Sequence, residues 1–462
     1  MLTYSLENRK GLPLYESLYR HIRQDILDGT LQEGERLPSK RALAEHLRLS
    51  VITVESAYQQ LEAEGYVYTL PRRGFFVSRV ERSSAPAMAV PVSPPPVSPV
   101  WRLDLRSNQV DHSRFPAATW ARLTRQVLSE GGSAFLSPIP HQGLPTLRQA
   151  IADDLRDFRG MSVSPEQIVI GAGAEYLYML LAQLLGRDAV FALEDPGYSK
   201  IRQVYTRCGA ACLPIPLDGQ GLDIDALSQS AATVAHISPS HHYPTGVVTS
   251  IGRRQALLRW AESVGGTIIE DDYDSEFRFS GRPIPTLQSI DRSGRVIYMN
   301  TFSQTISPSM RVGFMVLPPR LLEQYRGELD FYACTVPALE QHVLARFLSG
   351  GHYEQHLSRM RKEYRIRRAG VLEAFRNSSF AHRITLNEQG AGLHFLLRLD
   401  TAQTDEALRH KAESLGVRLG FLSEYAAIPS PDYDHTLVIN YAGLDAARLE
   451  DALRLLETVF SE

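Results

Sequence analysis

The stretch from Tyr298 to Gly313 contains side chains whose types and spacing suit the binding of an anion. It reads Y-M-N-T-F-S-Q-T-I-S-P-S-M-R-V-G, so a strand-like start is followed by hydroxyl groups, among them Thr301 and Ser303, and then by Arg311. Hydroxyls, backbone N–H groups and a guanidinium gathered at one turn can hold a phosphate or carboxylate. A polar loop that satisfies its own backbone is the alternative explanation of the same residues.

Similar polar clusters follow other expected strands. The apolar run 168–170 precedes the turn G-A-G-A-E and an apolar helix, the run 189–193 ends in E-D-P-G-Y, and the run 267–269 leads into E-D-D-Y-D. Strand and helix patterns alternate from residue 101 onward, which predicts an α/β fold around a mainly parallel sheet. The carboxyl ends of such strands share one edge, where ligands bind. We therefore expect a phosphorylated aromatic ligand with a basic ring nitrogen there, although G-A-G-A by itself fits tight packing equally well.

Composition places the chain among ordinary globular proteins. It has 462 residues, 44% hydrophobic and 22% charged, with a net charge of −3, so any contact with DNA must come from a local basic patch. The three cysteines show no metal-ligand spacing, and no apolar run is long enough to cross a membrane. We expect a cytoplasmic protein with no membrane contact.

The first 79 residues predict a winged helix-turn-helix. Leu18, Ile22 and Ile26 share one face of a first helix, Ser39 and Ser50 stand where caps would start two more, and a hairpin has P-R-R-G at its tip. A structural three-helix domain would explain the helices but not the basic tip.

The run P-L-Y-E-S-L-Y-R-H-I-R-Q-D-I-L-D-G-T-L-Q-E-G-E-R-L-P-S-K-R-A-L-A-E-H-L resembles a GntR-type DNA-binding domain, and the resemblance covers residues 11–78. It implies a double-stranded DNA operator as partner. The family's S-R-x-T-V is S-V-I-T-V here, so Val51 replaces an arginine and could instead touch a thymine methyl group. The residues expected to contact DNA are Lys40, Arg41, Ser50, Thr53, Arg72 and Arg73.

A proline-rich stretch follows, with three consecutive prolines and no helical or strand period, which is typical of a semi-rigid tether. The chain is thus expected to consist of a DNA-binding domain over 1–79, a linker over 80–101 and a ligand-binding domain over 102–462.

The motifs E-D-P-G-Y, S-P-S-H-H-Y-P-T-G, E-D-D-Y-D-S-E-F-R, N-T-F-S-Q-T-I-S-P-S-M-R-V-G-F and G-A-G-L-H-F occur in this order. Together they resemble the aminotransferase-like domain of MocR-type (GabR-like) regulators. The resemblance implies a fold-type I domain like that of pyridoxal 5'-phosphate (PLP)-dependent transferases, with a mainly parallel sheet and a small C-terminal α+β subdomain. It also implies a homodimer.

Residue by residue, the resemblance implies that Asp271 pairs with the pyridine nitrogen of PLP and that Tyr273 binds its ring hydroxyl. A solvated acidic loop is the alternative for Asp271. The phosphate would be held by Gly173, Ala174, Ser303 and Arg311, and Tyr198 would line the ring or the effector pocket. No metal is expected, because His241, His242 and His394 lack a ligand spacing.

The resemblance places the Schiff-base lysine of the family at position 304, where this chain has Gln304. A carboxamide nitrogen is neither a nucleophile toward an aldehyde nor a general base, and neither Lys200 nor Lys362 belongs to the motif. We therefore expect no catalytic residue and no covalent internal aldimine. Three accounts stay open: a deliberate replacement that traps a non-covalent or external-aldimine state, a natural site that holds PLP or its amino-acid adduct, or a pocket for another ligand.

These observations predict a DNA-binding transcription regulator that senses PLP or an amino-acid-type effector. One alternative is a PLP-dependent aminotransferase with an accessory DNA-binding domain, and another is a regulator whose ligand is not PLP.

Overall fold

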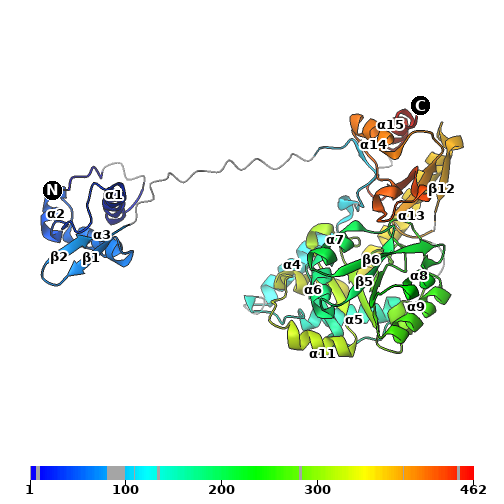
Figure 1. Ribbon diagram of the computed structural model, residues 1–462, viewed down its shortest axis with the longest axis horizontal. Helices are drawn as coiled ribbons and strands as arrows, with labels where there is room; N and C mark the ends of the chain where they lie inside the picture. Colours follow the sequence, from blue (N-terminus) through cyan, green and yellow to red (C-terminus); the bar gives the residue numbers. More distant parts are fainter. Residues whose placement is uncertain are drawn as a thin grey trace. The chain divides into compact units, whose positions relative to one another are not determined.

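The computed structural model (Figure 1) describes residues 2–6, 11–80, 99–108, 110–132, 136–279, 284–388, 390–444 and 448–461. The chain divides into two compact units, Met1–Ser98 and Pro99–Glu462. Most of the expected proline-rich tether lies outside the described residues. None of the described helices is long and apolar enough to cross a membrane.

The first unit is a three-helix domain with a two-stranded wing. The side chains of Ser39 and Ser50 accept hydrogen bonds from the N–H groups of Ala42 and Thr53, which starts the second and third helices at the expected residues. Apolar side chains from all three helices and the wing form one buried core. The elements are α1 (Leu14–Asp28), α2 (Lys40–Leu47), α3 (Val51–Ala63), β1 (Val67–Leu70) and β2 (Gly74–Val77).

The second unit is built around an eight-stranded sheet with the order β4-β11-β10-β9-β8-β5-β6-β7. The strands from β10 to β6 pair in parallel, whereas β11 is antiparallel to both neighbours and β7 to its one neighbour. The predicted mainly parallel sheet is confirmed. Its strands are β4 (Ile168–Gly171), β5 (Val190–Asp195), β6 (Ala211–Asp218), β7 (Gly221–Leu222), β8 (Val234–Ile237), β9 (Thr267–Asp271), β10 (Val296–Thr301) and β11 (Gly313–Val316).

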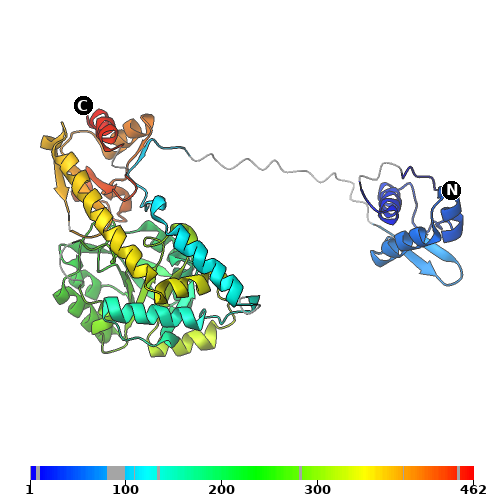
Figure 2. The same ribbon diagram turned by 180° about the vertical axis from the view of Figure 1, so that it is seen from behind.

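Helices cover both faces of this sheet because successive side chains of each strand point to opposite faces. Tyr298 joins the cluster beneath α4 (Ala117–Glu130), α5 (Pro145–Arg159) and α12 (Ala338–Ser349), which Figure 2 shows from behind. Its neighbours Ile297 and Met299 join the opposite cluster, beneath α6 (Ala174–Leu185), α7 (Ser199–Arg207) and α11 (Pro319–Glu328). The sheet is therefore buried on both faces, and its polar side chains collect at the strand ends.

A smaller α+β part completes the second unit. The strands β12 (Ile384–Asn387), β13 (His394–Leu399) and β15 (Thr436–Asn440) form an antiparallel sheet packed against α14 (Asp405–Ser414) and α15 (Leu449–Phe460). The long helix α13 (His352–Arg376) joins the two parts, because Leu357 lies in the core of the large sheet and Phe375 in the core of the small one.

Candidate functional site

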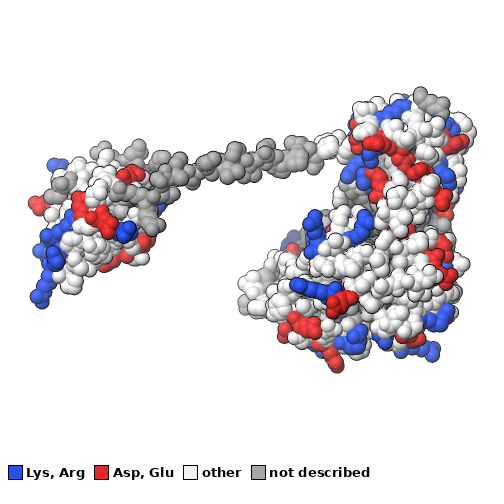
Figure 3. Space-filling view, in the orientation of Figure 1, with Lys and Arg blue, Asp and Glu red and all other residues white. Residues whose placement is uncertain are grey.

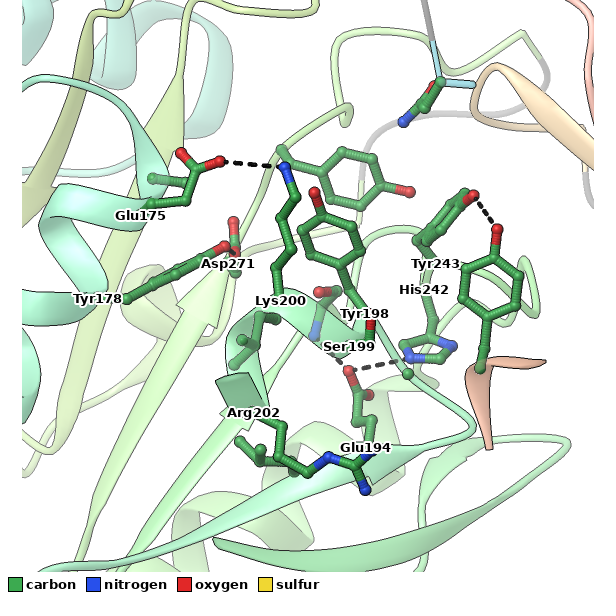
Figure 4. Close-up of a pocket in the computed structure, with 18 of the residues that line it drawn as sticks. Glu175, Tyr178, Glu194, Tyr198, Ser199, Lys200, Arg202, His242, Tyr243 and Asp271 are labelled. Atoms are coloured by element: carbon green, nitrogen blue, oxygen red, sulfur yellow. Dashed lines mark hydrogen bonds and ion pairs between the residues drawn. The ribbon is translucent and has the colours of Figure 1, made fainter. Parts of the chain in front are cut away.

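A pocket of about 630 Å³ opens at the carboxyl ends of the parallel strands (Figure 4). Its walls come from the segments that follow β5, β8, β9 and β10, together with the first turn of α6. The structure thus brings together clusters that are more than a hundred residues apart in the chain, at the edge that the strand order predicts. Of the eight residues expected to bind a cofactor, seven line this pocket: Ala174, Tyr198, Asp271, Tyr273, Ser303, Gln304 and Arg311.

Asp271, the last residue of β9, is buried and its two carboxylate oxygens have different surroundings. Oδ2 accepts a hydrogen bond of 2.6 Å from the hydroxyl of Tyr178 and lies 3.4 Å from Nε2 of His236. Tyr205 in turn contacts Nδ1 of His236 at 2.8 Å, so a chain of side chains holds this oxygen in place. Oδ1 is equally buried but has no hydrogen-bond partner among the described residues. A buried carboxylate oxygen without a partner is costly, and a protonated ring nitrogen would satisfy it.

Tyr273 stands beside Asp271 as a neutral hydrogen-bonding group. Burial, reinforced by the nearby Asp274, raises the pKa of the Tyr273 phenol well above its usual value. Its hydroxyl lies 3.5 Å from Nδ1 of His241, and the same nitrogen lies 2.8 Å from the carboxylate of Asp274. The shorter contact assigns Nδ1 of His241 to Asp274, and this leaves the Tyr273 phenol able to exchange a hydrogen bond with a ring hydroxyl.

Arg311 lies at the mouth of the pocket, in the left-handed backbone region with φ +51°. Its guanidinium contacts the carboxylate of Glu175 at 2.5 Å, and a side chain at Gly173 would collide with it, since a Cβ there would be 2.4 Å from Nη2. The N–H of Gly173 already donates to the carbonyl of Gly171, so Gly173 contributes open space for Arg311 rather than a free amide. Ser303 and the start of α6 complete a cradle for an anion.

Lys200 is a pocket residue that the sequence motifs did not single out. It lies in the first turn of α7, and its ammonium is 3.5 Å from Glu175 and 5.9 Å from the ring centre of Tyr198. The adjacent phenol of Tyr198 raises the pKa of Lys200, so the ammonium keeps its charge. The only sequence signal was its position two residues after the last residue of E-D-P-G-Y, on the turn that carries Tyr198.

Gln304 provides no amine to the pocket. Its Nε2 donates to the backbone carbonyl of Asn108 at 3.4 Å, and its Oε1 is buried without a partner among the described residues.

The histidines near the pocket have structural partners. His394 contacts the carbonyl of Pro244 at 3.0 Å and His242 contacts Thr245 at 2.8 Å. Burial lowers the pKa of His242 to about 3 and raises that of its neighbour Glu194 to about 8, which favours the neutral form of both groups. In the part of the chain that the structure describes, no group of three or more His, Cys, Asp or Glu residues is arranged to hold a metal ion.

The predicted DNA-contacting residues lie on α2, on α3 and at the tip of the wing. Arg41, Arg72 and Arg73 are exposed, and Figure 3 shows Lys and Arg side chains gathered along one edge of this unit. Lys40 is held 2.5 Å from Glu55, and the hydroxyls of Ser50 and Thr53 lie 2.8 Å apart at the start of α3.

Val51 and Ile52 are unusual for the first turn of α3 because they are apolar and exposed, at 42% and 74% of their surface. Neither belongs to the core of the unit, whose α3 members include Val54 and Leu61. The first turn of α3 therefore presents exposed methyl groups.

Each of the two units matches a known protein family. Residues 14–77 match the family of bacterial regulatory proteins of the gntR type, and residues 102–456 match aminotransferase class I and II. The fold of the second unit is also that of an archaeal alanine:glyoxylate aminotransferase, with a TM-score of 0.68 and 23% identity over 78% of this chain and 90% of that one.

Relatives that match over nearly their whole length are named as transcription regulators or regulatory proteins. The chain is 34% identical to the uncharacterized HTH-type transcriptional regulator YdeL of Bacillus subtilis over 99% of both chains. It is 31% identical to the probable rhizopine catabolism regulatory protein MocR of Rhizobium meliloti (98% of this chain, 95% of that one) and to the pyridoxine biosynthesis regulator PdxR of Corynebacterium glutamicum (98% and 96%).

A GntR-type DNA-binding domain followed by an aminotransferase-like domain defines a class of bacterial DNA-binding transcription regulators. The chain belongs to the MocR-type family of that class. The class I and II aminotransferase fold also indicates binding of PLP.

Proposed function

We propose that the second unit is a sensor that binds a PLP-type ligand without a covalent bond and does not catalyse transamination. The observation that carries this proposal is the pairing of Asp271, whose buried Oδ1 lacks a partner, with Gln304, which lacks an amine. The first feature suits a protonated pyridine nitrogen, and the second removes the nucleophile and general base that the family's lysine would supply.

The chain's own residues would divide the binding between them. Asp271 would hold the ring nitrogen, Tyr273 the ring hydroxyl, and Arg311 with Ser303 and the N–H of Ala174 the phosphate, while Tyr198 would cover the ring. Bound PLP supplies an electron-poor ring and an aldehyde, and with Gln304 at this position the aldehyde has no partner from the motif.

The first unit would read the operator through the major groove with α3 and through the backbone with the wing. Arg41, Arg72 and Arg73 are exposed for phosphate contacts, and Lys40, Ser50 and Thr53 lie at the start of α2 and α3. We expect the protein to act in the cytoplasm. We also expect a homodimer, because the first units of two chains that bind one palindromic site add their few DNA contacts. Ligand binding would shift the spacing at which the two DNA-binding units of the dimer fit DNA.

The experiment is a titration of the full chain with PLP beside the variant Gln304→Lys, followed by absorbance and by borohydride reduction with peptide mapping. We expect saturable, reversible binding to the chain as it stands and a reducible covalent bond at residue 304 in the variant alone. Absence of saturable binding of PLP and also of its aminomethyl and hydroxymethyl analogues by the chain as it stands would refute the proposal. Turnover of amino acids by that chain would also refute it and would favour the competing function, an aminotransferase with an accessory DNA-binding domain.

A further inference from the structure

We propose that the pocket selects the aminomethyl form of the ligand, pyridoxamine 5'-phosphate, over the aldehyde form. This inference rests on the proposed function, namely that a pyridine phosphate binds with its ring nitrogen at Asp271. The inference concerns the ring substituent of the ligand that would face position 304. It is based on the side-chain oxygens of Gln304 and Asn108, which are both buried without a partner among the described residues.

The orientation of the Gln304 amide is determined by its partner. Nε2 lies 3.4 Å from the backbone carbonyl of Asn108, and a carbonyl can only accept a hydrogen bond. The amide nitrogen must therefore be on that side, which leaves Oε1 on the other. Oε1 is buried and accepts no hydrogen bond from any described residue.

Asn108 contributes a second buried side-chain oxygen. Oδ1 is buried and has no hydrogen-bond partner among the described residues, and Asn108 lines the same pocket as Gln304. Two buried acceptors that lack donors make this part of the pocket complementary to a donor. A buried acceptor is satisfied by an N–H group and destabilised by a second acceptor.

The forms of the ligand differ in this property. An amine or ammonium on the ring's methylene group donates two or three hydrogen bonds, whereas an aldehyde oxygen can only accept. A hydroxymethyl group can do either and should rank between them. The two oxygens of Gln304 and Asn108 therefore favour the amine and disfavour the aldehyde.

The length of the side chain points the same way. The path from Cα to Oε1 in glutamine is one bond shorter than the path from Cα to Nζ in lysine. Replacement of lysine by Gln304 thus leaves room for a nitrogen atom that the ligand itself carries. Several cations that line the pocket have carboxylate partners, which offset their repulsion of an ammonium group on the ligand. Arg106 lies 3.3 Å from Glu424, Arg418 lies 3.3 Å from Asp104, and Arg311 and Lys200 both pair with Glu175.

The test is a calorimetric titration of the full chain with three probes: pyridoxamine, pyridoxine and pyridoxal 5'-phosphates. We expect affinity to fall in that order, with about a tenfold or larger difference between the amine and the aldehyde, as one charge-assisted hydrogen bond provides. The aldehyde titration is repeated on Lys200→Arg, which keeps the charge but removes an amine that could react with the aldehyde.

Variants at 304 test the assignment to this side chain. Gln304→Met, of similar length but without an acceptor, should lose most of the preference for the amine, and Gln304→Glu, whose carboxylate accepts from an ammonium, should increase it. Equal affinities for the three probes, or a preference that survives in Gln304→Met, would overturn the inference while the proposed function stands. If none of the three probes binds to the folded chain, the proposed function itself fails.

Discussion

Asp271 has one carboxylate oxygen that neighbouring side chains hold in place and one that lacks a partner among the described residues. Tyr178 and His236 hold Oδ2, which fixes the rotamer, and Oδ1 is the atom that we propose pairs with the ring nitrogen of the ligand.

The variant Asp271→Asn should therefore weaken binding of pyridoxamine 5'-phosphate by about ten- to a hundredfold, because a neutral amide replaces a charge-assisted partner of the ring nitrogen. The control is Tyr178→Phe, which removes the hydrogen bond to the other oxygen and should have a smaller effect. Calorimetry on the full chain measures both. Unchanged affinity in Asp271→Asn would show that the ring nitrogen binds elsewhere.

Ile52 and Val51 lead to a prediction about DNA. Exposed methyl groups at the start of α3 suit the C5-methyl group of thymine in the major groove. In duplexes selected from a random pool by the full chain, replacement of a contacted thymine by uracil should weaken binding about fourfold, the value of one buried methyl group.

The matched variant is Ile52→Ala, which should bind the thymine and uracil duplexes at that position with similar affinity. An equally large thymine preference in Ile52→Ala would assign the contact to another side chain. If no thymine-to-uracil replacement in the selected duplexes weakens binding, the predicted contact with a thymine methyl group is refuted.

At the scale of elements, the cradle at the start of α6 already has an internal anion. Glu175 pairs with both Arg311 and Lys200, so a phosphate entering the cradle must compete with this carboxylate. The helix terminus alone would attract an anion, but Glu175 lowers the net positive charge that the ligand meets.

We expect Glu175→Gln to bind inorganic phosphate several-fold more tightly, since about 1 kcal/mol is a typical value for a partly exposed ion pair. Competition of phosphate with pyridoxamine 5'-phosphate gives the measurement. Glu130→Gln is the control, because Glu130 pairs with Arg346 at 2.8 Å without lining the pocket. A weaker phosphate affinity in Glu175→Gln would mean that Glu175 organises the cradle rather than competing for it.

At the scale of the whole molecule, several carboxyl groups are buried with raised pKa values. Burial raises the pKa of Glu194 to about 8 and those of Glu270 and Glu276 to about 7. A carboxyl group whose pKa is raised on folding stabilises the fold at low pH and loses that contribution as pH rises through the folded value. His242, whose pKa is lowered to about 3, has the opposite effect, but that effect is complete by about pH 6.5.

The thermal unfolding temperature of the second unit should therefore fall as pH rises from about 6.5 to about 8.5. Differential scanning calorimetry on the full chain measures it. In Glu194→Gln the fall should be shallower, because an amide oxygen can still accept from the N–H of Ser238 but has no proton to lose. A fall of unchanged steepness in that variant would mean that Glu194 is ionised in the folded protein.

The sequence by itself determined the features that depend on local rules. Apolar periodicity, the caps at Ser39 and Ser50 and the placement of polar motifs after strands predicted the winged helix-turn-helix, the mainly parallel sheet and the edge where a pocket lies. These signals are local because helix caps and strand alternation depend on neighbours a few residues away.

Only the tertiary structure decided which partners the pocket side chains have. Gln304 meets the backbone of Asn108 across 196 residues of chain, Tyr178 meets Asp271 across 93, and Arg311 meets Glu175 across 136. Such contacts depend on how the strands are ordered in the sheet, and no local pattern encodes that order. The resemblance predicted from the motif that position 304 lacks the family's lysine. The tertiary structure added that the amide nitrogen of Gln304 faces the carbonyl of Asn108 and that its oxygen is buried without a partner among the described residues.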